Sequence, residues 1–187
     1  VVFHYALIKE GRVKYELVLC LCIEGNSMAN SLEVIGHRGA SGTEPENTLQ
    51  AFEKAIEQTA TMIELDVQKC KTGQLVVFHD DQLERTTNGA GWLKDYSLSD
   101  LKKLDAGNGQ TIPKLQEVIE NVNRRVPINI ELKEPGIALD VGKVITHYIE
   151  NGWAPGAFLI TSFDHRQIRL FTQQYPDIPA GIIICSM

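Results

Sequence analysis

Short apolar runs alternate with longer amphipathic stretches along this 187-residue chain from residue 33 onward. The short runs are typical of strands buried on both faces, whereas the longer stretches repeat apolar residues at helical spacing. Within 48–59, for example, Leu49, Phe52 and Ile56 share one helix face. The pattern predicts strands at 34–36, 62–67, 74–78, 127–133, 157–163 and 180–185. It predicts helices at 48–59, 97–104, 113–123, 139–151 and 164–174, with Asn47 as the N-cap of the first.

Repeated strand–helix units with buried strands indicate an α/β protein with a parallel sheet and helices outside it. A closed (β/α)₈ barrel has eight strands and about 250 residues, whereas this pattern contains about six strands. No covering helix follows the last apolar strand. This favours a TIM-type barrel truncated after about six strands over an open sheet.

Two segments do not fit the alternation. Residues 1–27 read as two β runs around a Gly-containing turn. They are either an extension ahead of a natural start at Met28 or a genuine hairpin or appendage, so we expect the main domain to occupy 28–187. The stretch 81–113 has little regular pattern, and a loop of that length inside a compact domain is usually functional.

Composition narrows the classes of partner and compartment. The formal net charge is −6 and the chain has no Lys/Arg-rich block, so we expect no nucleic-acid partner. No segment is apolar over the roughly 20 residues that span a membrane, and no convincing signal peptide is present. We therefore expect a cytoplasmic protein without stable membrane insertion. The four cysteines match neither a disulfide framework nor a zinc pattern. The oligomeric state stays open.

Polar side chains gather at the carboxyl ends of the predicted strands. These ends meet on one face of a parallel sheet or barrel, which is where active sites lie. The side chains are His37 and Arg38 after the first strand, Glu64 and Asp66 in the second, His79 and Asp80 after the third, and Glu131 and Lys133 at the end of the fourth. We expect them to converge on one site.

Strand periodicity predicts a metal site within this group. Glu64 and Asp66 are two residues apart and point to the same side of a strand, as do Glu131 and Lys133. Three converging carboxylates repel one another unless a positive charge lies among them. All-oxygen ligation favours one hard divalent cation, Mg²⁺ or Ca²⁺, with Mn²⁺ as a further candidate. The alternative is a buried ion-pair network, which desolvation makes a poor source of stability.

Two histidines, a divalent cation and two basic residues suit phosphoryl chemistry. The cation, Arg38 and Lys133 would neutralise phosphate oxygens, while His37 and His79 would move protons to and from the reacting oxygens. The chain has no P-loop or nucleotide-binding glycine pattern. A phosphate ester is therefore a better candidate ligand than a nucleoside triphosphate.

Five motifs occur in order from about residue 34 onward: HRGASGTEPENTLQAF, IELDVQ, LVVFHDDQLERTTNGAG, LDAG…IPKLQEV and INIELK. In order and spacing they closely resemble the glycerophosphodiester phosphodiesterase family. The resemblance implies a TIM-type barrel of the phospholipase C-like phosphodiesterase kind. It also implies a phosphoric diester hydrolase that converts small-molecule glycerophosphodiesters to glycerol 3-phosphate and an alcohol.

The resemblance assigns roles to the residues with the strongest chemistry. His37 and His79 match the family's general acid/base histidines. The ligands of one divalent cation match Glu64, Asp66 and Glu131. A first attack by the substrate's own glycerol hydroxyl, which gives a cyclic phosphate, and direct attack by water both stay open.

The resemblance also assigns roles around the reacting centre. Arg38 and Lys133 match phosphate-binding positions. Glu46 and Asn47 match the signature loop, which supports the site. The stretch 81–113 corresponds to an insertion that covers the site and contributes to substrate choice.

Two other interpretations stay open. A related barrel that cleaves phospholipid head groups, as toxin-type phospholipases D do, would favour exposed apolar loops and a secretion signal, and neither is evident. The other is an inactive or incomplete barrel that serves as a binding module or exists as a fragment. The absence of the family's last two strands motivates that interpretation, and the intact motifs argue against it.

Overall fold

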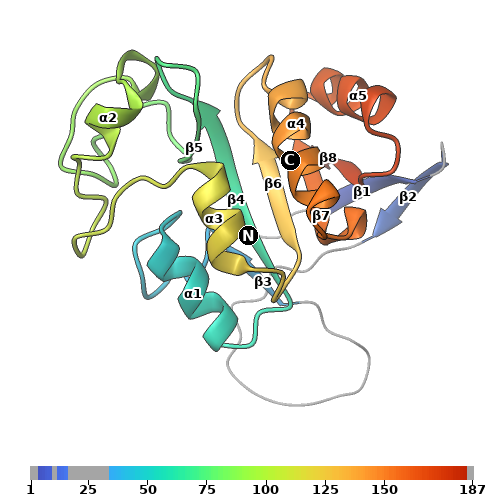
Figure 1. Cartoon of the computed structure of the whole chain (residues 1–187), viewed down its shortest axis with the longest axis horizontal. Coiled ribbons are helices and arrows are strands. Elements are labelled where there is room, and N and C mark those ends of the chain that lie inside the picture. The colour runs from blue at the N-terminus through green and yellow to red at the C-terminus, as the bar shows by residue number, and fades with distance from the viewer. Residues whose placement is uncertain (1–3, 10–11, 17–33, 185–187) are drawn as a thin grey trace.

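A computed structural model of the chain describes residues 4–9, 12–16 and 34–184 (Figure 1). Five adjacent parallel strands make up most of the sheet, and four helices lie in the connections between them. The strands are β3 (Ile35–His37), β4 (Met62–Lys69), β6 (Ile128–Leu132), β7 (Phe158–Ser162) and β8 (Ala180–Ile184). The helices are α1 (Leu49–Glu57), α3 (Leu115–Val122), α4 (Ala138–Glu150) and α5 (His165–Gln174). Every predicted strand and helix from residue 34 onward is present, although the helix predicted at 97–104 is only α2 (Leu98–Leu101).

The parallel strands lie side by side in chain order, β3-β4-β6-β7-β8. A doubly wound sheet would instead reverse its strand order at a switch point and carry helices on both faces. Here α1, α3, α4 and α5 all cover the same face of a curled sheet (Figure 1). This is the connectivity of the wall of a (β/α) barrel.

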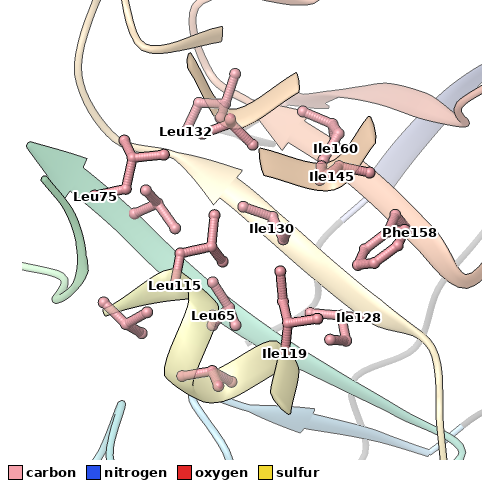
Figure 2. Close-up of a cluster of buried hydrophobic side chains, with 14 of the residues drawn as sticks. Leu65, Leu75, Leu115, Ile119, Ile128, Ile130, Leu132, Ile145, Phe158 and Ile160 are labelled. Atoms are coloured by element: carbon pink, nitrogen blue, oxygen red, sulfur yellow. The ribbon is translucent and has the colours of Figure 1, made fainter. Parts of the chain in front are cut away.

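Alternation along the strands separates an apolar face from a polar one. Figure 2 shows Leu65 of β4, Ile130 of β6 and Ile160 of β7 on the helix-facing side, packed with Leu115 of α3 and Ile145 of α4. All five are fully buried. Each such side chain contributes about 1.5–3 kcal/mol through removal of its surface from water. The apolar face therefore supplies the stability, and the opposite face is left for polar chemistry.

The strand predicted at 74–78 is not a parallel strand of this wall. It is β5 (Leu75–Val77), and it pairs antiparallel with β4, with Val67 opposite Val77. The short link after Lys69 cannot hold the crossover that a parallel pair requires, so the chain turns back as a hairpin. His79 reaches the site because β4 extends beyond the wall and β5 returns along it.

The stretch 81–113 packs around a second hydrophobic cluster, which it shares with the β4–β5 hairpin. It contains a short 3₁₀ helix, η1 (Leu93–Asp95), and α2. The cluster contains Leu83, Leu93, Leu101 and Ile112 from this stretch and Val76 and Phe78 from the β5 region. The stretch, called the insertion below, is thereby packed onto the β4–β5 hairpin.

The two β runs predicted near the N-terminus are β1 (His4–Lys9) and β2 (Arg12–Glu16), which form an antiparallel hairpin. β1 also pairs antiparallel with β8. Met28, Cys20, Cys22 and Cys185 lie outside the described residues. Within the described part of the chain, no helix combines the length and apolar character needed to cross a membrane.

Truncation of a buried leucine should test whether the helix–sheet core supplies the stability of the fold. Leu115→Ala in α3 should lower the free energy of unfolding by about 2–5 kcal/mol, because it leaves a cavity in the helix–sheet core. Leu170→Ala in α5 changes the same side chain at a position that is 43% exposed. It should shift stability by no more than about 0.5 kcal/mol. Urea unfolding followed by circular dichroism measures both, and equal effects would contradict the assignment of the core.

Candidate active site

The loop after β3 is folded tightly against the start of α1. Arg38 and Asn47 both adopt left-handed backbone conformations, with φ of 55° and 58°. The Asn47 amide donates to the Arg38 carbonyl at 3.0 Å, which closes the loop. Gly39 has φ +79°, and a Cβ there would lie 2.5 Å from the Ala51 carbonyl carbon. The close approach of loop and helix thus requires glycine at this position.

The N-cap prediction for Asn47 is wrong. Thr48 caps α1 instead, since its hydroxyl accepts a hydrogen bond from the Ala51 amide. The Asn47 side chain is buried and donates from Nδ2 to Oδ2 of Asp66 at 2.9 Å. Asn47 therefore connects the loop to β4 rather than beginning the helix.

Three carboxylates meet on the polar face of the sheet. Glu64 and Asp66 lie on β4 and are each 1% exposed, and Glu131 lies directly opposite Asp66 on β6. One carboxylate oxygen from each residue lies within 4.8 Å of the others. The alternation of β4 and β6 brings these side chains together, as strand periodicity predicts.

The carboxylate cluster is electrostatically unfavourable as it stands. Burial and the neighbouring charges of Asp66 and Glu131 raise the pKa of Glu64 well above its ordinary value. Burial and Asp66 also raise the pKa of Glu131. Oδ1 of Asp66 is buried and accepts no hydrogen bond from the residues that the structure describes. A divalent cation among these oxygens would relieve the repulsion and use the unsatisfied oxygen, so the residues present fit a metal site.

Two basic side chains border the carboxylates. Arg38 donates its backbone N–H to Glu64 at 2.9 Å, and its Nε lies 3.2 Å from Oδ2 of Asp66. Lys133 Nζ lies 2.9 Å from Glu131 and 3.6 Å from Asp66. Both basic residues predicted to bind phosphate therefore lie at the cluster and offset part of its negative charge.

The two predicted histidines approach the cluster from different elements. His37, at the end of β3, has Nε2 3.8 Å from Glu64, and burial together with the Arg38 charge lowers its pKa. His79, after β5, has Nδ1 2.5 Å from Oδ1 of Asp80. The structure thus brings the predicted histidines, carboxylates and basic residues to one face, while their roles stay predictions.

Sequence reasoning missed two residues that organise the His79 side. Gln68 lies on the same face of β4 as Glu64 and Asp66. Its buried side-chain amide donates to the carbonyls of residues 78, 79 and 80 at 2.8–3.1 Å. Continuing the two-residue alternation along β4 would have found it. Arg85, in the insertion, bonds both Asp80 and Glu46. Only its position within the motif LERTTNG hinted at it.

A cavity of about 620 Å³ opens beside the site. Its lining comes mainly from the insertion and the end of the β4–β5 hairpin. The lining residues are His79, Asp80, Asp81, Gln82, Glu84, Arg85, Trp92 and Lys133. His79 and Lys133 connect this cavity to the carboxylate cluster.

Comparison with known proteins identifies the family of this chain. Residues 37–185 match the glycerophosphoryl diester phosphodiesterase family. The chain belongs to this family. It is 42% identical over 166 residues to the glycerophosphodiester phosphodiesterase of Bacillus altitudinis and 41% identical over 163 residues to that of Caldanaerobacter subterraneus. These alignments cover 81% and 80% of the chain, and 66% and 65% of the two relatives, so the chain spans just under two thirds of their length.

Solved structures of the glycerophosphodiester phosphodiesterase family share this fold. An Oleispira antarctica phosphodiesterase in complex with the product sn-glycerol-3-phosphate superposes with a TM-score of 0.70 at 34% identity. The match covers 78% of this chain and 63% of that one. The fold class predicted from the sequence, a TIM-type barrel, is confirmed, and the five parallel strands form an arc of its wall.

Without a cation, the contribution of Glu64 to the free energy of unfolding should fall as the pH rises above the ordinary carboxyl range. The pKa of Glu64 is raised on folding. The stability linked to its proton is therefore present at low pH and is lost as the pH passes through the raised value. Added Ca²⁺ or Mg²⁺ should raise the melting temperature more at about pH 8 than at about pH 5, since metal ligands must be deprotonated. Thermal scans with and without EDTA measure this, and equal shifts at the two pH values would contradict it.

Glu64→Gln should separate charge repulsion from cation binding. Removal of one charge should stabilise the cation-free chain at about pH 8 and abolish most of the stabilisation by added cation. Glu53→Gln is the matched control, because Glu53 pairs with Arg125 on the outer surface. It should leave the cation-induced shift in melting temperature unchanged. A Glu64→Gln chain that keeps the full shift would exclude Glu64 as a ligand.

Proposed function

We propose that this chain carries out metal-dependent hydrolysis of glycerophosphodiesters to glycerol 3-phosphate and an alcohol. The observation that most supports this proposal is the cluster of Glu64, Asp66 and Glu131. Their carboxylates are buried, lie close to one another and are flanked by two histidines. Membership of the family supports the same reaction class. The Oleispira antarctica relative, solved with sn-glycerol-3-phosphate, supports a small-molecule phosphodiester as the substrate.

The three carboxylates would hold one divalent cation, with Mg²⁺ and Ca²⁺ as the first candidates and Mn²⁺ as the third. Their oxygen-only donor set favours these hard ions over zinc. When bound, the cation supplies positive charge that offsets the negative charge developing on the phosphate oxygens. Arg38 and Lys133 lie at the same cluster and would orient the phosphate through hydrogen bonds to its oxygens.

His37 and His79 would carry the protons. One imidazole takes a proton from the attacking hydroxyl, and the other donates a proton to the departing alkoxide, so that the product leaves as an alcohol. The lowered pKa of His37 keeps its imidazole neutral near pH 7, as a proton acceptor must be. The geometry is compatible with either a water or the substrate's own glycerol hydroxyl as the attacking group.

The cavity beside His79 would receive the alcohol portion of the substrate. Trp92, Asp81 and Glu84 in its wall come from the insertion, as does Arg85. Substrate choice would then depend on the insertion, while bond cleavage depends on the sheet. Domain limits of 28–187 for the catalytic unit and 81–113 for the insertion are part of this proposal.

An assay with glycerophosphocholine tests the reaction directly. Release of glycerol 3-phosphate should require a divalent cation and stop on addition of EDTA. His37→Ala should lower kcat by about 10²–10⁴-fold, the range for loss of a general acid or base. His165→Ala, at an exposed position on α5, is the matched control and should retain activity. A folded chain without turnover in Mg²⁺, Ca²⁺ or Mn²⁺ would refute the proposal and favour an incomplete barrel.

A further inference from the structure

Arg85 bridges two carboxylates that come from opposite sides of the candidate site. Its Nε and Nη2 lie 2.5 and 3.0 Å from the two oxygens of Asp80. Its Nη1 and Nη2 lie 2.7 Å from the two oxygens of Glu46. The planar guanidinium is suited to this double fork, which a lysine ammonium cannot reproduce.

On one side, the bridge leads to His79. Asp80 accepts a hydrogen bond at 2.5 Å from Nδ1 of His79 when that nitrogen carries the proton. A carboxylate on Nδ1 fixes the tautomer and the plane of the ring, and leaves Nε2 as the nitrogen that exchanges a proton with substrate. Hydrogen bonds from Arg85 hold the pKa of Asp80 at about 2, so this acceptor stays ionised.

On the other side, the bridge leads to the loop after β3. Oε1 of Glu46 also accepts a hydrogen bond from Nη1 of Arg38 at 2.9 Å. Arg38 in turn contacts Glu64 and Asp66. One guanidinium from the insertion therefore joins the histidine side of the site to its phosphate-binding side.

We infer that Arg85 is a positioning residue, which sets the orientation and tautomer of His79 through Asp80 and fixes the insertion to the site through Glu46. The inference rests on the proposed function for its catalytic consequence, but the orientation of His79 is observable without turnover. A purely stabilising role would be weak, because the Arg85 side chain is 48% exposed and exposed ion pairs contribute little.

The chain offers a matched control for Arg85. Arg125 makes the same two-pronged contact with Glu53, at 2.7 and 2.6 Å, on the outer surface. Both Arg→Ala variants remove a partly exposed arginine that pairs with carboxylates, Asp80 and Glu46 for Arg85 and Glu53 for Arg125. Because exposed ion pairs contribute little, the loss of stability should be small in both variants. Only Arg85 connects to a candidate catalytic side chain.

Kinetics in the presence of divalent cation give the first readout. With glycerophosphocholine, Arg85→Ala should lower kcat by roughly 10- to 100-fold, the effect of a misplaced catalytic group, with a smaller change in KM. Arg85→Lys should recover only part of the loss, and Arg125→Ala should match the wild type. The double variant Asp80→Asn, Arg85→Ala should have a kcat no lower than that of the slower single variant. The reason is that Arg85 acts on His79 through Asp80, so the two losses are not additive. Wild-type kcat for Arg85→Ala, or full additivity, would overturn the inference.

Imidazole ¹⁵N NMR of the full chain gives the second readout, and it does not depend on activity. The His79 signals, assigned by their loss in His79→Gln, should show Nδ1 protonated in the wild type and in Arg125→Ala. They should shift toward the other tautomer in Arg85→Ala. Unchanged His79 signals would overturn the inference even if the rate fell. An inactive wild type whose His79 signals respond to Arg85→Ala would refute the proposed function and leave the positioning role standing.

Discussion

Repulsion among three buried carboxylates is the constraint around which this molecule is organised. Glu64, Asp66 and Glu131 are held together by the register of β4 and β6. Left alone, such a group would separate or take up protons, as the raised pKa values of Glu64 and Glu131 show. The packed helices on the opposite face keep the strands in place, so hydrophobic burial holds an arrangement that electrostatics disfavours.

Cationic and hydrogen-bonding groups reach these carboxylates from two neighbouring segments. Arg38 and Asn47 approach from the loop after β3, and Lys133 from the end of β6. The left-handed conformations of Arg38 and Asn47 turn the loop back onto β4, which brings both side chains to the buried carboxylates. Local backbone strain is accepted where it brings a donor to a buried carboxylate.

Periodicity accounts for what the sequence could predict. Alternation on β4 and β6 was sufficient to place Glu64, Asp66 and Glu131 on one face, and helical spacing predicted α1, α3, α4 and α5. The direction of β5 does not follow from periodicity, because the residues of an apolar strand do not indicate whether it pairs parallel or antiparallel. Only the short link before β5 favours a hairpin.

Contacts between segments distant in the chain account for what was missed. Asn47 and Thr48 are both good capping residues, and only the position of Asp66 determines that Asn47 turns away from the helix. Arg85 shows no periodicity at all. Its partner Glu46 is 39 residues away in the chain, so its role follows from tertiary structure alone.

The two ends of the insertion lie close together beside β5. Val77 donates its amide hydrogen to the Pro113 carbonyl at 2.8 Å, and Val76 pairs with Lys114. A segment whose ends adjoin can be lengthened, shortened or replaced without moving the parallel strands, provided that it keeps apolar residues against Val76 and Phe78. Replacement of this segment during evolution would change the cavity wall and leave the carboxylates of the sheet in place. Any replacement would have to bring an arginine back between Asp80 and Glu46.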